Sequence, residues 1–341
     1  MKSYPAIARA NGHPARHRKP IHDQLNRSTL RDLATSLKKQ WKRYRKGLKR
    51  CQDRFSEEAV HESRVETRRL LSLLELLKPF LRRGQFNKAQ AALKQHLDTF
   101  DDLRDIQVQL LAIDKIRRIL PVADSFHYYL VNREERYARE TRAHIKLIKT
   151  RRLAKYIASC REEIKKWRSD FPVEKVNAML LASVDGAFAK TLHLHRNIRA
   201  NDTETIHRTR VAFKKVRYMI EILSDYLPLA DDKLLVAMHR YQTMMGDIQD
   251  AEVILRTFDK FLLKKSVDLP AARRFRRELL RRRQWLVRVY LDAADQLLEF
   301  WRLETTPDRN GPPPAMLDGK TQALAASPRP EGISKPKLQR G

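Results

Sequence analysis

Two segments of the chain, residues 60–70 and 206–216, carry the same arrangement of one histidine and several basic side chains. In each segment an arginine follows the histidine by three residues, and a second basic residue follows it by seven. On an α-helix, with ~100° of rotation per residue, these side chains fall on one narrow ridge. Arginine grips phosphate oxygens with a planar fork, lysine adds a point charge, and histidine donates hydrogen bonds. The pattern therefore predicts the binding of phosphate groups.

The first ridge holds His61, Arg64 and Arg68, and the second holds His207, Arg210, Lys214 and Arg217. The basic residues Arg69 and Lys215 lie about 80° away, on a flank of each ridge. Positions three and four residues apart on a helix are ~5–6 Å from each other, which suits a linear polymer of closely spaced phosphates. A solvated basic face is the alternative, but two ridges in register, each beginning with histidine, favour a functional site.

A second element repeats at nearly the same distance along the chain. Residues 101–108 align with residues 246–253 at an offset of 250 − 105 = 145, and the two histidines are 207 − 61 = 146 residues apart. Two matches in the same order predict a duplicated helical unit. Gly246 is expected to allow close helix packing. The aspartates are expected to pair with the arginines, and a metal site formed with the histidines is the alternative; these are Asp101, Asp105, Asp247 and Asp250.

The composition favours a polyanionic partner. Lysine and arginine total 71 against 41 acidic residues, a formal charge of +30 in 341 residues. Such a surface attracts nucleic acid, polyphosphate or anionic lipid. Cys51 and Cys160 are too few for a disulfide framework and lack metal-site spacing. The first residues lack the apolar stretch of an export signal, and no apolar run approaches the ~20 residues that span a membrane. A cytoplasmic protein without membrane insertion is expected.

Apolar residues recur every three or four positions along most of the chain, which predicts an all-α fold. Nine helices are expected, at about 30–50, 56–77, 86–110, 122–148, 153–167, 173–195, 205–227, 231–263 and 271–301. Residues 27–170 and 171–303 are expected to form one helical bundle each, the two copies of the repeat. Residues 1–26 are interpreted as a flexible basic arm and residues 304–341 as a disordered tail, because both are rich in proline or polar residues. Trp41, Trp285 and Trp301 are expected to anchor the core.

The two repeated elements resemble the signature helices and third-helix motifs of CHAD domains, the conserved histidine α-helical domains. The resemblance covers roughly residues 28–302 and rests on four motif matches in the family's order. It implies two antiparallel four-helix bundles related by a pseudo-twofold axis, so that residues 27–303 form one CHAD domain. It also implies a basic channel between the bundles that binds inorganic polyphosphate, and an association with polyphosphate or other storage granules and their proteins.

The candidate polyphosphate-binding residues are His61, Arg64, Arg68, Arg69, His207, Arg210, Lys214, Lys215, Arg217 and, on the basic face of the first helix, Lys42. Where the second copy has Arg217, the first has Leu71, so the first copy is expected to bind less strongly. Many CHAD proteins carry an adjoining triphosphate-tunnel domain with a Glu-x-Glu-x-Lys strand, and this sequence has no such motif. No catalytic activity, cofactor or metal is therefore expected.

Three other functions stay open at this point. A nucleic-acid-binding protein fits the charge, although no helix-turn-helix, zinc or RNA-binding sheet motif is present, and weak nucleic-acid binding is expected in any case. A phosphohistidine relay through His61 or His207 is less favoured, because a dense ridge of cations would retain the phosphate. A metal-dependent phosphohydrolase would need the histidines and aspartates as ligands, and these lack familiar spacing.

Overall fold

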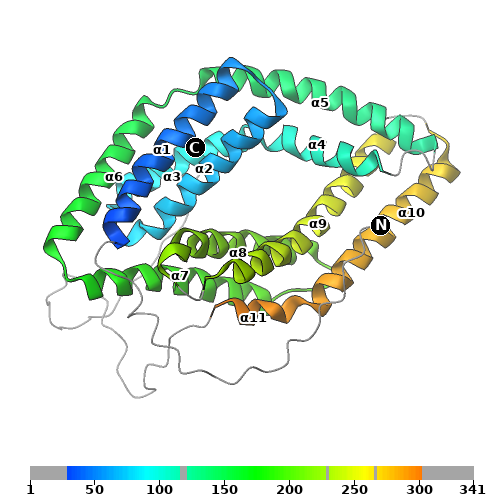
Figure 1. The fold of residues 1–341 in the computed structure, drawn as a ribbon. Coiled ribbons are helices and arrows are strands. Elements are labelled where there is room, and N and C mark those ends of the chain that lie inside the picture. The colour runs from blue at the N-terminus through cyan, green and yellow to red at the C-terminus, as the bar shows by residue number, and fades with distance from the viewer. Residues whose placement is uncertain (1–28, 116–120, 228–229, 265–266, 302–341) are drawn as a thin grey trace, which may run out of the picture. The chain divides into compact units, whose positions relative to one another are not determined.

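The computed structural model describes residues 29–115, 121–227, 230–264 and 267–301, and the predicted arm and tail lie outside these ranges. Within them the chain is helical, without a named β-strand, so the all-α prediction is confirmed (Figure 1). The first half contains α1 (Thr29–Asp53), α2 (Glu57–Leu76), α3 (Arg83–Asp98), α4 (Asp101–Ile113), α5 (Pro121–Leu147) and α6 (Arg151–Asp170). The second contains α7 (Val173–Arg196), α8 (Thr203–Leu223), α9 (Asp232–Leu262), α10 (Leu269–Asp292) and α11 (Leu297–Phe300). Three short 3-10 helices, Lys78–Phe80, Ser224–Tyr226 and Ala294–Gln296, link them.

The two ridges lie on α2 and α8, and each of these helices begins with a capping residue five positions before its histidine. The Ser56 hydroxyl accepts a hydrogen bond from the Ala59 N–H, and the Asp202 carboxylate accepts one from the Glu204 N–H. Such caps satisfy the unpaired N–H groups of the first turn. Because both copies start at the same distance from the ridge, His61 and His207 occupy equivalent turns of their helices.

The repeat is not symmetric at its second element. The single helix expected at 86–110 is divided into α3 and α4, and the break falls at Thr99 and Phe100. In the second copy, α9 runs without interruption from Asp232 through Gly246 to Leu262. The break contains neither proline nor glycine, which is why the sequence pattern did not predict it. Asp101 therefore lies in the first turn of a helix, where the dipole favours a negative charge, whereas Gly246 lies in a helix interior.

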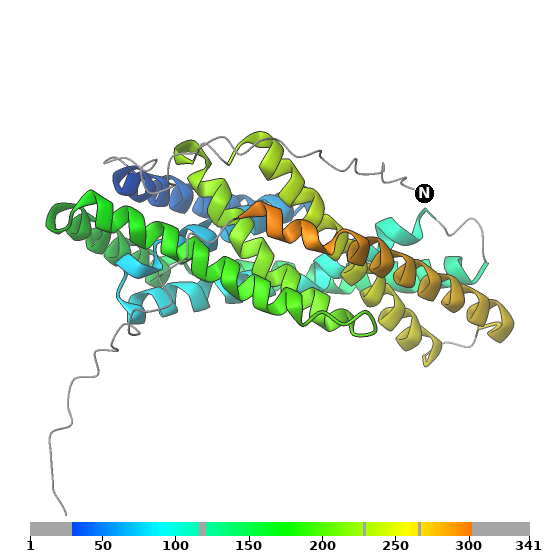
Figure 2. The same cartoon turned by 90° about the horizontal axis from the view of Figure 1, so that it is seen from below.

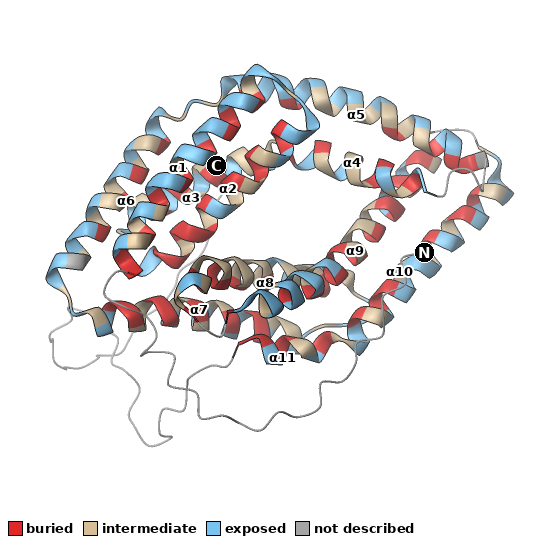
Figure 3. Cartoon of the chain, viewed as in Figure 1, coloured by how far each residue is buried: buried red, intermediate tan, exposed pale blue. Residues whose placement is uncertain are grey.

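The buried side chains do not divide into one core per half. One hydrophobic cluster combines residues of α1, α2, α3 and α6 with residues of α7, α8, the first part of α9 and the end of α10. A second cluster joins α4 and α5 to the last part of α9 and the first part of α10, around Phe126, Phe258 and Phe275. The expected arrangement of two separate four-helix bundles is therefore not confirmed, because the described helices share cores across the two halves. Figure 3 colours the helices by burial, and buried residues occur on helices of both halves. The expected boundary at 170/171 falls between α6 and α7.

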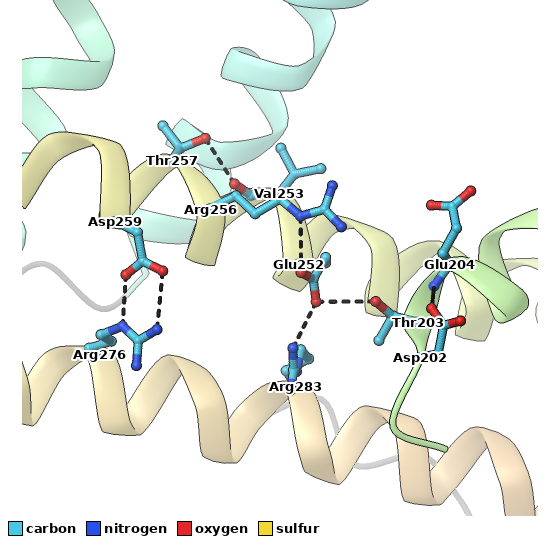
Figure 4. Close-up of polar contacts among 10 residues, drawn as sticks. All are labelled: Asp202, Thr203, Glu204, Glu252, Val253, Arg256, Thr257, Asp259, Arg276 and Arg283. Atoms are coloured by element: carbon cyan, nitrogen blue, oxygen red, sulfur yellow. Dashed lines mark hydrogen bonds and ion pairs between the residues drawn. The ribbon is translucent and has the colours of Figure 1, made fainter. Parts of the chain in front are cut away.

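Polar contacts connect α10 to α9 and to the start of α8 (Figure 4). The Glu252 carboxylate accepts hydrogen bonds from Arg283 of α10, Arg256 of α9 and the Thr203 hydroxyl at the start of α8. Arg276 of α10 makes two bonds to Asp259, of 2.7 and 3.1 Å. Both ribbon views show α10 running alongside α9 (Figures 1 and 2). Two arginines of α10, Arg276 and Arg283, are thus held in ion pairs within the fold.

The tryptophans do not all anchor the core. Trp301 is buried, and its indole N–H donates to Asp185 at 2.7 Å. Trp41 is half-buried and stacks on Tyr44. Trp285 is 46% exposed, so the prediction was wrong for this residue, because its position on α10 faces away from the packed side of the helix. Within the described residues, no helix is long and apolar enough to cross a membrane.

Candidate anion-binding site

The structure brings cationic side chains of both repeats together where α2 packs against α8 and the first turns of α4. We refer to these six residues as the cation cluster: Arg64 and Arg68 of α2, Arg104 of α4, and Arg210, Lys214 and Arg217 of α8. Burial lowers the pKa values of Arg64, Arg68 and Lys214, and repulsion from the other cations of the cluster lowers them further. Cations of the two ridges, which are 146 residues apart in the sequence, therefore lie close together in the fold.

Lys214 is the most perturbed member of the cation cluster. Burial is the main cause that lowers its pKa to about 7, and repulsion from Arg68, Arg210, Arg64 and Arg217 lowers it further. Burial also lowers the pKa of Arg68, and repulsion from Arg210 and Arg104 lowers it further. Withdrawing a cation from water beside other cations disfavours its charged form. At neutral pH this part of the site is short of negative charge.

In the first copy, Arg64 is tied to an aspartate. Its side chain is only 6% exposed, and its Nη1 donates to the Asp101 carboxylate at 3.0 Å. The guanidinium also lies over the Phe100 ring, at 6.0 Å from the centroid. The expectation that the repeated aspartates hold the arginines is confirmed for this pair.

In the second copy, the equivalent arginine lies against a glycine. A Cβ atom built on Gly246 would be 3.4 Å from both Nε and Nη2 of Arg210, so the guanidinium rests directly on the backbone of α9. The Nε atom is buried and has no hydrogen-bond partner within the described structure. The close packing expected at Gly246 is thus packing with Arg210. Asp250 is electrostatically close to Arg210, and burial raises its pKa to about 6.

The two histidines differ as well. His207 is half-buried, burial lowers its pKa, and Gln249 forms a hydrogen bond with its side chain. Its Nδ1 atom is buried and has no hydrogen-bond partner within the described residues. A neutral imidazole of this kind can donate one hydrogen bond to a phosphate oxygen. His61 is exposed at the surface of α2.

The flanking residues are held in ion pairs. Arg69 bonds to Glu66 at 3.2 Å within α2. Lys215 pairs with Glu75, which links α8 to α2 across the two repeats. Arg217, on the ridge, donates to Gln242 at 3.0 Å and to Glu221 at 3.1 Å, and it lies over the Tyr218 ring. Arg69, Lys215 and Arg217 are thus each paired with a carboxylate, and of these pairs only Lys215–Glu75 joins the two repeats.

Lys42 lies in a different place from the cation cluster. It is exposed and lines a groove of about 860 Å³ with Lys38, Lys46 and other residues of α1, together with Ile148 and Arg161. The sequence could not distinguish this solvated basic face from the site, because both consist of basic residues at helical spacing.

Sequence reasoning missed Arg104 as a member of the cation cluster. Its charge lowers the pKa values of Arg64 and Arg68, so it lies near both. The signal was present, since Arg104 aligns with Gln249 in the repeated aspartate element, and Gln249 contacts His207. Within the described residues, no group of three histidine, cysteine or acidic side chains is placed to hold a metal ion.

The chain matches a family model described as the CHAD domain over residues 32–259, a range that includes both ridges. No curated protein matches it. The fold is similar to the crystal structure of the CHAD domain from the plant Ricinus communis, with 17% identity, a TM-score of 0.52, and 88% of this chain and 98% of that chain covered. It is also similar to PptA from Streptomyces chartreusis, with 14% identity, a TM-score of 0.51, and 82% and 100% covered. At these identities, the likeness is one of fold.

Proposed function

The chain belongs to the CHAD domain family, and from this premise we propose that it binds inorganic polyphosphate through the cation cluster. Some members of the family bind polyphosphate. The observation that carries the proposal is the burial of Lys214 among four arginines, which lowers its pKa to about 7. An arrangement that destabilises its own charges is expected to persist where a ligand relieves the repulsion.

A linear chain of phosphates fits this site better than a single phosphate. Arg210, Lys214 and Arg217 follow one side of α8 at helical spacing, over a rise of about 10 Å. Arg68 and Arg104 approach them from α2 and α4. Several phosphate groups could thus contact different helices at the same time, so affinity should grow with the length of the polymer.

The proposed role is binding rather than catalysis. The cluster consists of groups that hold phosphate oxygens, and the sequence has no Glu-x-Glu-x-Lys motif of a triphosphate-tunnel enzyme. In this proposal the chain is cytoplasmic and attaches to polyphosphate or storage granules, where polyphosphate itself, or a granule protein, retains it.

Direct titration tests the proposal. The purified chain is titrated with polyphosphate of defined lengths, and with DNA and RNA at matched phosphate concentration, near physiological salt. Polyphosphate should bind more tightly than either nucleic acid, and combining His207→Ala with Arg210→Ala should weaken it by at least about tenfold, because charge-assisted hydrogen bonds are lost. Lys155→Ala, on the exposed face of α6, removes one charge away from the cluster and serves as the control.

The alternative function has a distinct signature in the same titration. A nucleic-acid-binding protein would bind DNA or RNA at least as tightly as polyphosphate. Its affinity would also respond to the control substitution as much as to the cluster substitutions, because binding would follow net charge. That result would reject the polyphosphate proposal.

A further inference from the structure

The equivalent arginines of the two repeats, Arg64 and Arg210, have different hydrogen-bond partners. Arg64 is buried with its guanidinium bonded to Asp101, whereas the Nε of Arg210 is buried without a partner against Gly246. The offset of 145 residues places Asp101 and Gly246 at the same position of the repeat. One aligned position therefore decides whether its arginine has an internal carboxylate.

Backbone structure reinforces this difference. The chain breaks between α3 and α4, so Asp101 lies in the first turn of α4, close enough to α2 to bond Arg64. In the second copy α9 is continuous, and the absence of a side chain at Gly246 lets the Arg210 guanidinium lie on its backbone. No left-handed φ is recorded at Gly246, and a Cβ there would lie 3.4 Å from the mobile end of Arg210, so a small side chain at this position would need only a small shift of the guanidinium.

We propose that Arg210 is the arginine that binds the phosphate chain and that Arg64 is a positioning residue, with position 101/246 of the repeat determining these roles. The inference rests on the proposed function and specifies how the two copies share it. Arg210 and His207 lie one turn apart on α8 and both side chains are partly exposed, so a phosphate oxygen can accept hydrogen bonds from their accessible N–H groups. In the first copy Asp101 already satisfies Arg64 and repels an approaching anion.

The nearest counter-charges agree with this assignment. Asp250 is a carboxylate near Arg210, and because burial raises its pKa to about 6, its protonation costs less free energy than that of an ordinary aspartate. Asp101 is 56% exposed, lies in the first turn of α4 and accepts a hydrogen bond from Arg64. A polyanion would therefore have to displace a hydrogen-bonded carboxylate at Arg64, whereas the Nε of Arg210 has no such partner among the described residues.

The test moves the aspartate between the copies. Gly246→Asp should place a carboxylate against Arg210 and weaken polyphosphate binding by about 10- to 100-fold, the value of one charge-assisted contact. The slope of log affinity against log salt should also become shallower by about 0.7–0.9, since one phosphate contact is lost. Gly246→Asn has nearly the same size without the charge, and it should retain most of the affinity.

The reciprocal variant separates this inference from a general effect of charge. Asp101→Asn combined with Gly246→Asp has the net charge of the wild type, and it frees Arg64 while pairing Arg210. It should bind more tightly than Gly246→Asp alone, with thermal melting confirming that each variant is folded. If wild-type chain binds polyphosphate but Gly246→Asp and Gly246→Asn bind equally, or the exchange restores nothing, the assignment of roles is overturned. If the wild-type chain itself does not bind, the proposed function fails instead.

Discussion

Replacing both Lys214 and Arg68 by methionine is expected to weaken polyphosphate binding by at least about 100-fold, and to make the free protein more stable. Both groups are cations whose pKa values burial and neighbouring arginines lower, so each raises the free energy of the folded state in its charged form. Methionine keeps most of the apolar volume of either side chain and removes the charge. The binding loss arises because two charge-assisted contacts disappear together.

The opposite changes in affinity and stability make this result diagnostic. The melting temperature should rise by about 1–2 °C, since a penalty of order 1 kcal/mol is removed from a chain of this size. Lys215→Met is the matched control, because Lys215 is the neighbour of Lys214 but pairs with Glu75. It should lower stability slightly, by up to about 1 kcal/mol, and change affinity far less. Reduced stability together with unchanged binding in the double variant would contradict the assignment of the cation cluster as the site.

A second large effect is expected from pH. The pKa of Lys214 is about 7 in the folded chain and near 10.5 when exposed to water. Bound phosphate would hold the proton on this ammonium, so polyphosphate affinity should fall by about tenfold per pH unit between pH 7 and pH 9. Below pH 7 Lys214 is charged in both states and contributes no pH dependence. Calorimetry at pH 8 in buffers of different ionisation heat should show uptake of close to one proton on binding.

Lys214→Arg provides the control for this pH dependence. Arginine stays protonated throughout, so this variant should retain its affinity between pH 7 and pH 9, and proton uptake should disappear. Asp250 acts in a separate, lower window: its pKa of about 6 means that it gains negative charge beside Arg210 as pH rises through 6. If the affinity of Lys214→Arg falls between pH 7 and pH 9 as much as that of the wild type, a group other than Lys214 causes the pH dependence.

The lowered pKa of Lys214 also affects the stability of the chain in the absence of polyphosphate. When the pKa of a lysine is lower in the folded chain than in the unfolded chain, the unfolded chain binds the proton more tightly. The free energy of unfolding should therefore rise as pH increases from about 7 towards 10, as far as Lys214 is concerned. Bound polyphosphate should remove this rise, because the ligand restores the proton to the folded state.

The sequence by itself determined the all-α fold, most helix positions and both ridges, because apolar spacing and the His-x-x-Arg pattern are local and repeat at one offset. It also predicted that aspartates of the second element pair with arginines, as Asp101 does with Arg64. It could not separate Lys42 from the site, since a basic helical face looks the same whether it meets another cation-bearing helix or water.

Only the tertiary structure decided which cations meet and what holds each of them. The packing of α2 against α8 and α4 gathers charges from distant parts of the chain and adds Arg104 to them. It also divides the buried core among helices of both halves instead of into two bundles. The perturbed pKa of Lys214 and the unequal environments of Arg64 and Arg210 follow from this packing, because burial and through-space charge depend on distance in the fold and not on spacing in the sequence.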